Sequence, residues 1–396
     1  MTAEVALLNR NGAVLGSDSF GKVQINNKRK FISVEKIFPL SPNRSVGVMV
    51  YNFVHFMGTP WDTIIKVYSS YLGDKSFGTL KEYAEHFLSF FASERRFSAP
   101  LVEKLIIQNA LDYCIQEIIN SVKSTGDNAK NIDIEVEKQL AFFSKEKFLT
   151  GFDESFIKNF TEIHSGELEV YINKKPEFKV DAKTQQNLIK LSAYAICKGN
   201  FIFKFGSSGL VFAGYGENEI FPSIYGFDVF ASIDGKLIYR PSTSSNISFI
   251  NKQSIYSFGE TNVLATYIDG INPDLNDMIT GEFKLRLEDL SKKLENKLSN
   301  KDLDIFRSFI ASEIKEFQNN VFNFQLENCI KPILLMVGML NKQELATLTE
   351  SLVSLTLTRQ KFSTDEQTAG GEIDVACITK GEGFSWIRNK WSAALI

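Results

Sequence analysis

The chain has 396 residues, of which 44% are hydrophobic and 23% are charged, and its formal net charge at pH 7 is −3. This length can bury a large core, and the composition is typical of a soluble globular protein. The small net charge gives no electrostatic reason to expect a nucleic-acid partner. No apolar run approaches the roughly 20 residues that a membrane-spanning helix needs, so we expect no membrane segment.

The cysteines and histidines favour neither disulfides nor a metal. The four cysteines are widely spaced and contain no C-x-x-C pair, and none of the three histidines has the spacing of a metal ligand. Without a secretory signal, the cysteines are expected to be reduced thiols in a cytoplasmic protein. We therefore predict no metal site and no cofactor.

The start of the chain contains a candidate nucleophile. Thr2 follows Met1 directly, and its side chain is small enough that we expect an aminopeptidase to remove Met1. A free α-amino group has a reference pKa of about 7.7 to 8.0. Near neutral pH part of this amine is unprotonated, and it can take the hydroxyl proton while Oγ attacks a carbonyl. Thr2 would then carry its own base.

A hairpin follows this threonine. Two apolar strands, 3–9 and 13–18, flank Asn11-Gly12, which is a strong hairpin signal. A two-residue loop at this dipeptide would pair Leu8 with Leu15. Because side chains alternate along a strand, that register would place the threonine and the aspartate at the end of the second strand on opposite faces.

We predict the other register, in which the loop has three residues, 10–12, and its glycine is left-handed in a bulge. This loop pairs Glu4 with Asp18 and leaves Thr2 diagonal to Asp18 on one face. Diagonal neighbours lie about 7 to 8 Å apart. Lys36 is the lysine that we expect between them.

The rest of the chain alternates short apolar runs with helical periodicity. Strands are predicted at 32–40, 45–51, 201–205, 209–214, 223–233, 236–239, 371–379 and 383–390. Helices are predicted at 61–71, 80–91, 100–122, 134–144, 154–162, 184–197, 260–268 and 342–361, with a further helical segment from 282.

Several motifs resemble a known family. Thr2, the run Ala13-Val14-Leu15-Gly16-Ser17-Asp18-Ser19 and Glu35-Lys36-Ile37 resemble the N-terminal nucleophile hydrolases, most closely the proteasome β-subunit branch. Further along, 210–216 and 233–236 are similar to the central strands of those subunits. Ser257-Phe258-Gly259-Glu260 is similar to their small turn, and Asp365, Thr368 and Gly370-Gly371 to their second acidic-hydroxyl pair and its glycines.

This resemblance implies roles for single residues. Thr2 would be the nucleophile, Lys36 would lower the pKa of the Thr2 amine, and Asp18 would hold Lys36. Asp365 and Thr368 would support the amine.

The resemblance also implies an oxyanion site. Backbone N–H groups near Tyr51 and Asn52 would bind the oxyanion, and Ser257 and Gly259 would add support. The family usually has a glycine where this chain has the Tyr51-Asn52 segment, a difference that favours a chain without activity.

The fold that the resemblance implies is an α+β, four-layer αββα sandwich, and short strands interleaved with helix pairs suit two sheets flanked by helices. We expect a single domain over 1–396, with helical insertions at about 97–169 and 282–340. The insertions are predicted to be a packing layer or a docking surface for a partner.

The leading prediction is a threonine-type hydrolase that cleaves amide bonds, with peptides or proteins as the expected substrates. The resemblance adds a homo-oligomer, such as a ring, and an unfoldase or regulatory partner. Two alternatives stay open: an inactive scaffold or interaction subunit, and an amidase acting on small molecules.

Overall fold

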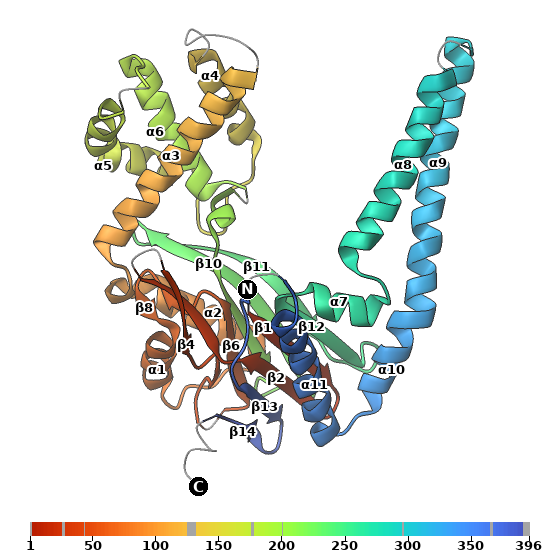
Figure 1. Ribbon diagram of the computed structural model, residues 1–396. Helices are drawn as coiled ribbons and strands as arrows, with labels where there is room; N and C mark the ends of the chain where they lie inside the picture. Colours follow the sequence, from red (N-terminus) through yellow and green to blue (C-terminus); the bar gives the residue numbers. More distant parts are fainter. Residues whose placement is uncertain are drawn as a thin grey trace. The chain divides into compact units, whose positions relative to one another are not determined.

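The computed structural model describes residues 2–25, 28–42, 44–124, 132–175, 178–199, 201–294, 297–364 and 367–390. Within these residues the chain divides into two compact units, which are coloured along the sequence in Figure 1. Unit 1 comprises Met1–Ile37, Ile220–Ser223 and Asn246–Ile396, and unit 2 comprises Phe38–Glu219 and Ile224–Ser245. The grouping of both units into a single domain stays a prediction.

Unit 1 contains an antiparallel sheet with strand order β12-β1-β2-β13-β14. Its strands are β1 (Ala3–Asn9), β2 (Gly12–Asp18), β12 (Gln253–Gly259), β13 (Ile373–Thr379) and β14 (Gly383–Arg388). A separate hairpin joins β3 (Phe20–Ile25) to β4 (Lys28–Ser33). The sheet thus places the first strand of the chain between the second strand and a strand about 250 residues further on.

The predicted register of the first hairpin is wrong. Glu4 pairs with Ser17 rather than with Asp18, and Asn9 pairs with Gly12, which leaves a two-residue turn at Arg10-Asn11. The rejected pairing of Leu8 with Leu15 is also absent, because Leu8 pairs with Ala13.

Tertiary contacts of Asn9 explain this register. Its side-chain oxygen accepts a hydrogen bond from the Asn11 N–H at 2.8 Å, which fixes the turn one residue earlier than the Asn-Gly signal suggests. Its side-chain nitrogen donates to the carbonyls of Val337 and Leu340 at 2.8 and 2.7 Å. Gly12 lies within the strand, where a Cβ atom would come within 2.9 Å of the Ile378 carbonyl.

One face of the unit 1 sheet is covered by α11 (Lys342–Lys361), which packs across β1, β2 and β13. The apolar residues Val5, Val14 and Val375 share a core with this helix. Because side chains alternate, Glu4, Ser17 and Asp374, which are paired across the three strands, lie on the other face.

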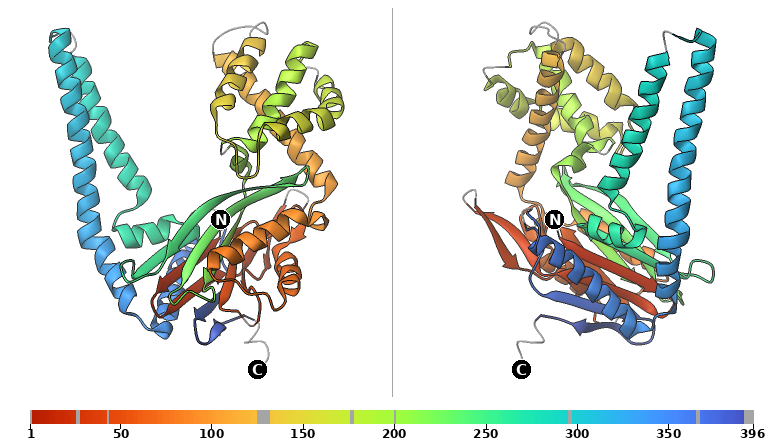
Figure 2. Two further views of the ribbon diagram at one scale, coloured as in Figure 1. Left: turned by 180° about the vertical axis from the view of Figure 1, so that it is seen from behind. Right: turned by 45° about the vertical axis from the view of Figure 1, so that its right-hand side comes forward.

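Further helices complete unit 1. They are α7 (Asn262–Asp269), α8 (Pro273–Leu294), α9 (Asn300–Gln325) and α10 (Lys331–Met339), and a π-helical turn, Leu326–Ile330, joins the last two. The two long helices α8 and α9 pack side by side, as both views of Figure 2 show. The helical segment predicted from 282 therefore begins earlier, at Pro273.

Unit 2 contains a sheet with strand order β11-β10-β9-β6-β5 and a small pair, β7 with β8. The bounds are β5 (Ile37–Pro39), β6 (Val46–Asn52), β7 (His55–Phe56), β8 (Thr59–Pro60), β9 (Ser208–Gly214), β10 (Ser223–Ile233) and β11 (Lys236–Asn246). β6 and β9 are antiparallel, and α2 packs against β9.

The helices of unit 2 begin and end close to their predicted bounds, except that the helix predicted at 154–162 continues to Asn173. They are α1 (Trp61–Leu72), α2 (Leu80–Ser93), α3 (Pro100–Ser124), α4 (Ile132–Lys145), α5 (Glu154–Asn173) and α6 (Ala182–Cys197), with short 3-10 turns at Arg95–Phe97 and Phe201–Phe205. The second turn corrects a predicted strand. Periodicity cannot distinguish a strand from a buried helical turn in such a short apolar run.

These elements confirm the predicted α+β class, with antiparallel sheets and many helices. Each unit contains a five-stranded sheet with at least one helix packed against it. A helix layer on a sheet is one half of an αββα sandwich. Among the described residues, no helix is long and apolar enough to cross a membrane.

The contacts of Asn9 lead to a stability prediction. Asn9→Ala removes one buried and one partly buried hydrogen bond to the end of α10 and should lower the free energy of unfolding by about 2 to 3 kcal/mol. Asn11→Ala is the matched control, because it removes an exposed bond to Leu340 and should cost less than about 1 kcal/mol. Urea denaturation of both variants tests this, and equal midpoints would contradict it.

Candidate functional site

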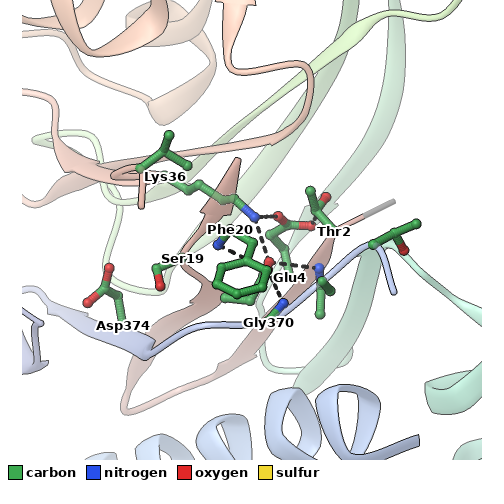
Figure 3. A network of polar contacts seen from close by, with 12 residues as sticks. Thr2, Glu4, Ser19, Phe20, Lys36, Gly370 and Asp374 are labelled. Atoms are coloured by element: carbon green, nitrogen blue, oxygen red, sulfur yellow. Dashed lines mark hydrogen bonds and ion pairs between the residues drawn. The ribbon is translucent and has the colours of Figure 1, made fainter. Parts of the chain in front are cut away.

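A cluster of charged side chains lies in unit 1, where β1 begins and β2 ends. Lys36 Nζ lies 2.5 Å from Asp18 Oδ1 and 3.1 Å from Glu4 Oε1. All three side chains have no exposed surface. Figure 3 shows the Lys36 side chain extending toward Glu4 and Thr2. The structure thus brings together the predicted pair Asp18 and Lys36 and adds a glutamate.

Thr2 is the next member of this cluster. Its hydroxyl donates a hydrogen bond to Glu4 Oε2 at 2.8 Å, and the residue is only 5% exposed. Its carbonyl accepts a hydrogen bond from the Glu260 N–H at 2.7 Å. Thr2 and Glu4 lie two residues apart on one strand, so alternation directs both side chains to the same face of the sheet.

Gly259 makes this close approach feasible. It has a left-handed φ of 72°, and a Cβ atom there would come within 2.1 Å of the Thr2 carbonyl and 2.7 Å of its hydroxyl. A residue without a side chain is therefore required beside Thr2. Ser257, predicted as a second support, pairs with Val5, so register places it on the face opposite Glu4.

Asp18 is held by the backbone of three separate segments. Its Oδ1 accepts a hydrogen bond from the Ala3 N–H at 3.0 Å, and its Oδ2 accepts bonds from the N–H groups of Gly370 at 2.9 Å and Phe20 at 3.3 Å. These bonds compensate for the hydration that the carboxylate loses on burial. Asp18 therefore holds the start of β1 and the segment just before β13 next to Lys36.

Burial dominates the electrostatics of the cluster. Burial raises the pKa of the Glu4 carboxyl from 4.5 to about 7, against the opposing attraction of Lys36, and repulsion from Asp18 adds to the rise. For Lys36, burial alone would lower the pKa of the ammonium. The neighbouring Glu4 and Asp18 carboxylates outweigh burial, so its pKa lies above the ordinary value.

Sequence reasoning did not assign a role to Glu4. The signal was present, because Glu4 is the only charged residue in the apolar strand Ala3–Asn9 and that strand is buried along its whole length. A charge in such a strand needs a partner, and Lys36 is the partner that the fold provides.

The same face of the sheet has a second buried ion pair. Lys390 Nζ lies 2.8 Å from Asp374 Oδ2, and Asp374 is paired through Ser17 with Glu4 across the strands. Within the described part of the chain, the buried Ser17 hydroxyl has no hydrogen-bond partner. The polar row Glu4–Ser17–Asp374 therefore extends from β1 to β13.

The remaining predicted site residues have other surroundings. Thr368 donates from its hydroxyl to Gln360 at 3.1 Å. Asp365 lies outside the described residues. Their support of the Thr2 amine stays a prediction.

The two predicted oxyanion residues end β6 in unit 2. The Tyr51 hydroxyl donates to Asp228 at 3.0 Å, and Asn52 has a left-handed φ of 65°. Their binding of an oxyanion stays a prediction. In the part of the chain that the structure describes, no group of three or more His, Cys, Asp and Glu side chains could hold a metal ion.

Comparisons with known proteins give little support to a family assignment. No family model matches the sequence, and no curated protein matches it. A solved structure that aligns with the chain is the "Anbu (Gly-1) mutant from Hyphomicrobium sp. strain MC1". Its sequence is 9% identical to this chain, and the TM-score of the alignment is 0.29. The alignment covers 100% of this chain and 95% of that one.

These findings correct the resemblance drawn from the motifs. A TM-score of 0.29 at 9% identity does not establish a common fold, and no family model supports the proteasome β-subunit assignment. The motifs on which that assignment was based are short, and part of their predicted geometry, the first hairpin register, is different in the structure. We therefore do not place the chain in that family.

The cluster leads to a pH-dependent stability prediction. Lys36→Met leaves the buried Asp18 and Glu4 carboxylates without their cation, so the free energy of unfolding should fall by about 3 to 5 kcal/mol at pH 8. The Glu4 pKa of about 7 includes a lowering by Lys36, so in the variant this pKa lies higher. At pH 5 Glu4 therefore binds a proton, which removes one of the two negative charges left without a cation. The loss measured by urea denaturation should then be smaller.

The control for this variant is Lys66→Met. Lys66 forms an exposed ion pair with Asp62, and its loss should change stability by less than about 1 kcal/mol at either pH. A Lys36→Met deficit that is equally large at pH 5 and pH 8 would contradict proton uptake by Glu4.

Proposed function

We propose that this chain is an amide hydrolase in which the Thr2 hydroxyl is the nucleophile, after cleavage of the Met1–Thr2 bond. The observation that supports this most directly is the hydrogen bond from Thr2 Oγ1 to Glu4, within a cluster whose charges are completely buried. Buried charges cost stability, and they are concentrated at functional sites.

The charge balance of the cluster supports the same proposal. With both carboxylates ionised, Glu4 and Asp18 together exceed the single positive charge of Lys36. Cleavage before Thr2 would create an ammonium group on the residue whose hydroxyl already contacts Glu4. That group would neutralise the excess negative charge, so the cluster suits a free N-terminal threonine better than a blocked one.

The proposed reaction has two stages. Thr2 Oγ attacks the substrate carbonyl and forms an ester, and water then hydrolyses this ester to restore the hydroxyl. Lys36 supplies positive charge next to the reacting residue, and Asp18, fixed by backbone N–H groups, positions Lys36. Donors for the oxyanion stay a prediction.

Peptides or proteins are the proposed substrates, and small-molecule amides are the alternative. Profiling the protein with peptides against simple acyl-amides separates these two classes. Assembly into a homo-oligomer, an unfoldase or regulatory partner and a cytoplasmic location stay predictions.

The second candidate function is an inactive scaffold. The observation that favours it is the 5% exposure of Thr2, together with a Lys36 that is already paired with two carboxylates. A stoichiometric partner that co-purifies with a chain whose Thr2 does not react would support this function.

The first test is the intact mass of the purified protein. Removal of Met1 should lower the mass by one methionine residue and leave Thr2 as the N-terminal residue. A retained Met1 or an acetyl group would block the amine and contradict the proposed form of the site.

The second test compares two substitutions of Thr2. Thr2→Ala keeps a small second residue, so Met1 removal should continue, but it deletes the nucleophile and should abolish amide hydrolysis. Thr2→Ser keeps a hydroxyl and should retain measurable turnover. Thr347→Ala, an exposed change on α11, is the control and should have wild-type activity. Turnover by Thr2→Ala at the wild-type rate would rule out the mechanism.

A further inference from the structure

We propose that Glu4 is the general base that accepts the Thr2 hydroxyl proton, a role that rests on the proposed function above. The Thr2 hydroxyl donates directly to Glu4 Oε2 at 2.8 Å, which is the geometry that proton transfer requires. Glu4 lies at the start of β1, two residues after Thr2, so no domain movement is needed to bring the two groups together.

The Glu4 carboxylate is held in a fixed orientation. Its second oxygen, Oε1, contacts Lys36 Nζ at 3.1 Å, and the same ammonium contacts Asp18 at 2.5 Å. Asp18 is in turn bonded to the backbone N–H groups of Ala3 and Gly370. One oxygen of Glu4 thus binds the lysine while the other faces the nucleophile.

Burial makes this carboxylate a stronger base than an exposed one. Loss of solvation raises the pKa of Glu4 to about 7 in the structure, close to the value that general-base catalysis favours at neutral pH. An ammonium on Thr2 would lower this pKa, because an opposite charge stabilises the carboxylate. The base form of Glu4 is therefore expected to dominate at and above about pH 7.

The Thr2 amine would be mostly protonated at neutral pH. Its reference pKa is about 7.7 to 8.0, so at pH 7 most of such an amine holds its proton. The Glu4 and Asp18 carboxylates favour the ammonium form, and the Lys36 ammonium favours the neutral amine. Glu4 is left as the base, and the amine acts as a positive charge.

The proton is conserved through the reaction. Oγ of Thr2 forms a bond to the carbonyl carbon as its proton moves to Glu4 Oε2. The C–N bond then breaks, and the leaving amine takes that proton from Glu4. In the second stage Glu4 accepts a proton from the attacking water and returns it to Thr2 Oγ as the ester C–O bond breaks.

The experiment measures acylation of Thr2 by a β-lactone, with the rate of the Thr2→Ala protein subtracted because amines and thiols also react with β-lactones. Intact mass gives the rate between pH 5 and pH 9 for the full-length protein. For the wild type the rate should rise with pH to a plateau, with an inflection at or below about 7. In Glu4→Gln the rate should fall roughly 100-fold, and the inflection should move above about 7.7, where the amine titrates.

Two further variants make the result specific. Glu372→Gln removes one negative charge from an exposed position next to β13 and should react like the wild type. Glu4→Asp keeps the charge but shortens the side chain by one methylene, so it should react more slowly. Its rate should still rise with pH to a plateau, with an inflection at or below about 7, as in the wild type. Circular dichroism of each variant establishes that it is folded.

The outcomes are distinguishable. A Glu4→Gln protein that reacts at the wild-type rate with the same inflection would overturn the role of Glu4 and leave Thr2 as the nucleophile. A wild-type protein that lacks Met1 and is not acylated at Thr2 would overturn the proposed function and, with it, this inference.

Discussion

The site in unit 1 depends on one interaction, the contact of the buried Lys36 ammonium with two carboxylates. Transferring these charges out of water costs several kcal/mol for each ion, and their mutual attraction compensates only when the remaining polar atoms are bonded. Asp18 meets this condition through the backbone N–H groups of Ala3, Phe20 and Gly370, which belong to three parts of the chain. Lys36 therefore determines how these segments meet.

Part of this site could be predicted from the sequence. Asp18 was expected at the end of the second strand with Lys36 beside it, and in the structure Lys36 Nζ lies 2.5 Å from Asp18 Oδ1. Glu4 was missed although it lies two residues after Thr2, a spacing that puts both side chains on the same face of the sheet. The predicted register had paired Glu4 with Asp18, so the glutamate was treated as a cross-strand neighbour and its own partner was not considered.

The errors have a common physical cause, which is that distant contacts override local signals. Asn11-Gly12 is a strong local turn signal, but Asn9 bonds to carbonyls near residue 340 and moves the turn by one residue. Thr368 bonds to Gln360 on a helix that the periodicity had predicted correctly, yet no local pattern reveals that bond. The helices were predicted well because their apolar spacing repeats over several turns.

The strand that positions Thr2 has a consequence for the rest of unit 1. β1 is a continuous run of seven buried residues, with Thr2 directly before it, Glu4 near its start and Asn9 at its end. Asn9 is bonded to the last turn of α10, which continues from α9 through a π-helical turn. The long helical hairpin and Thr2 are therefore attached to opposite ends of one strand.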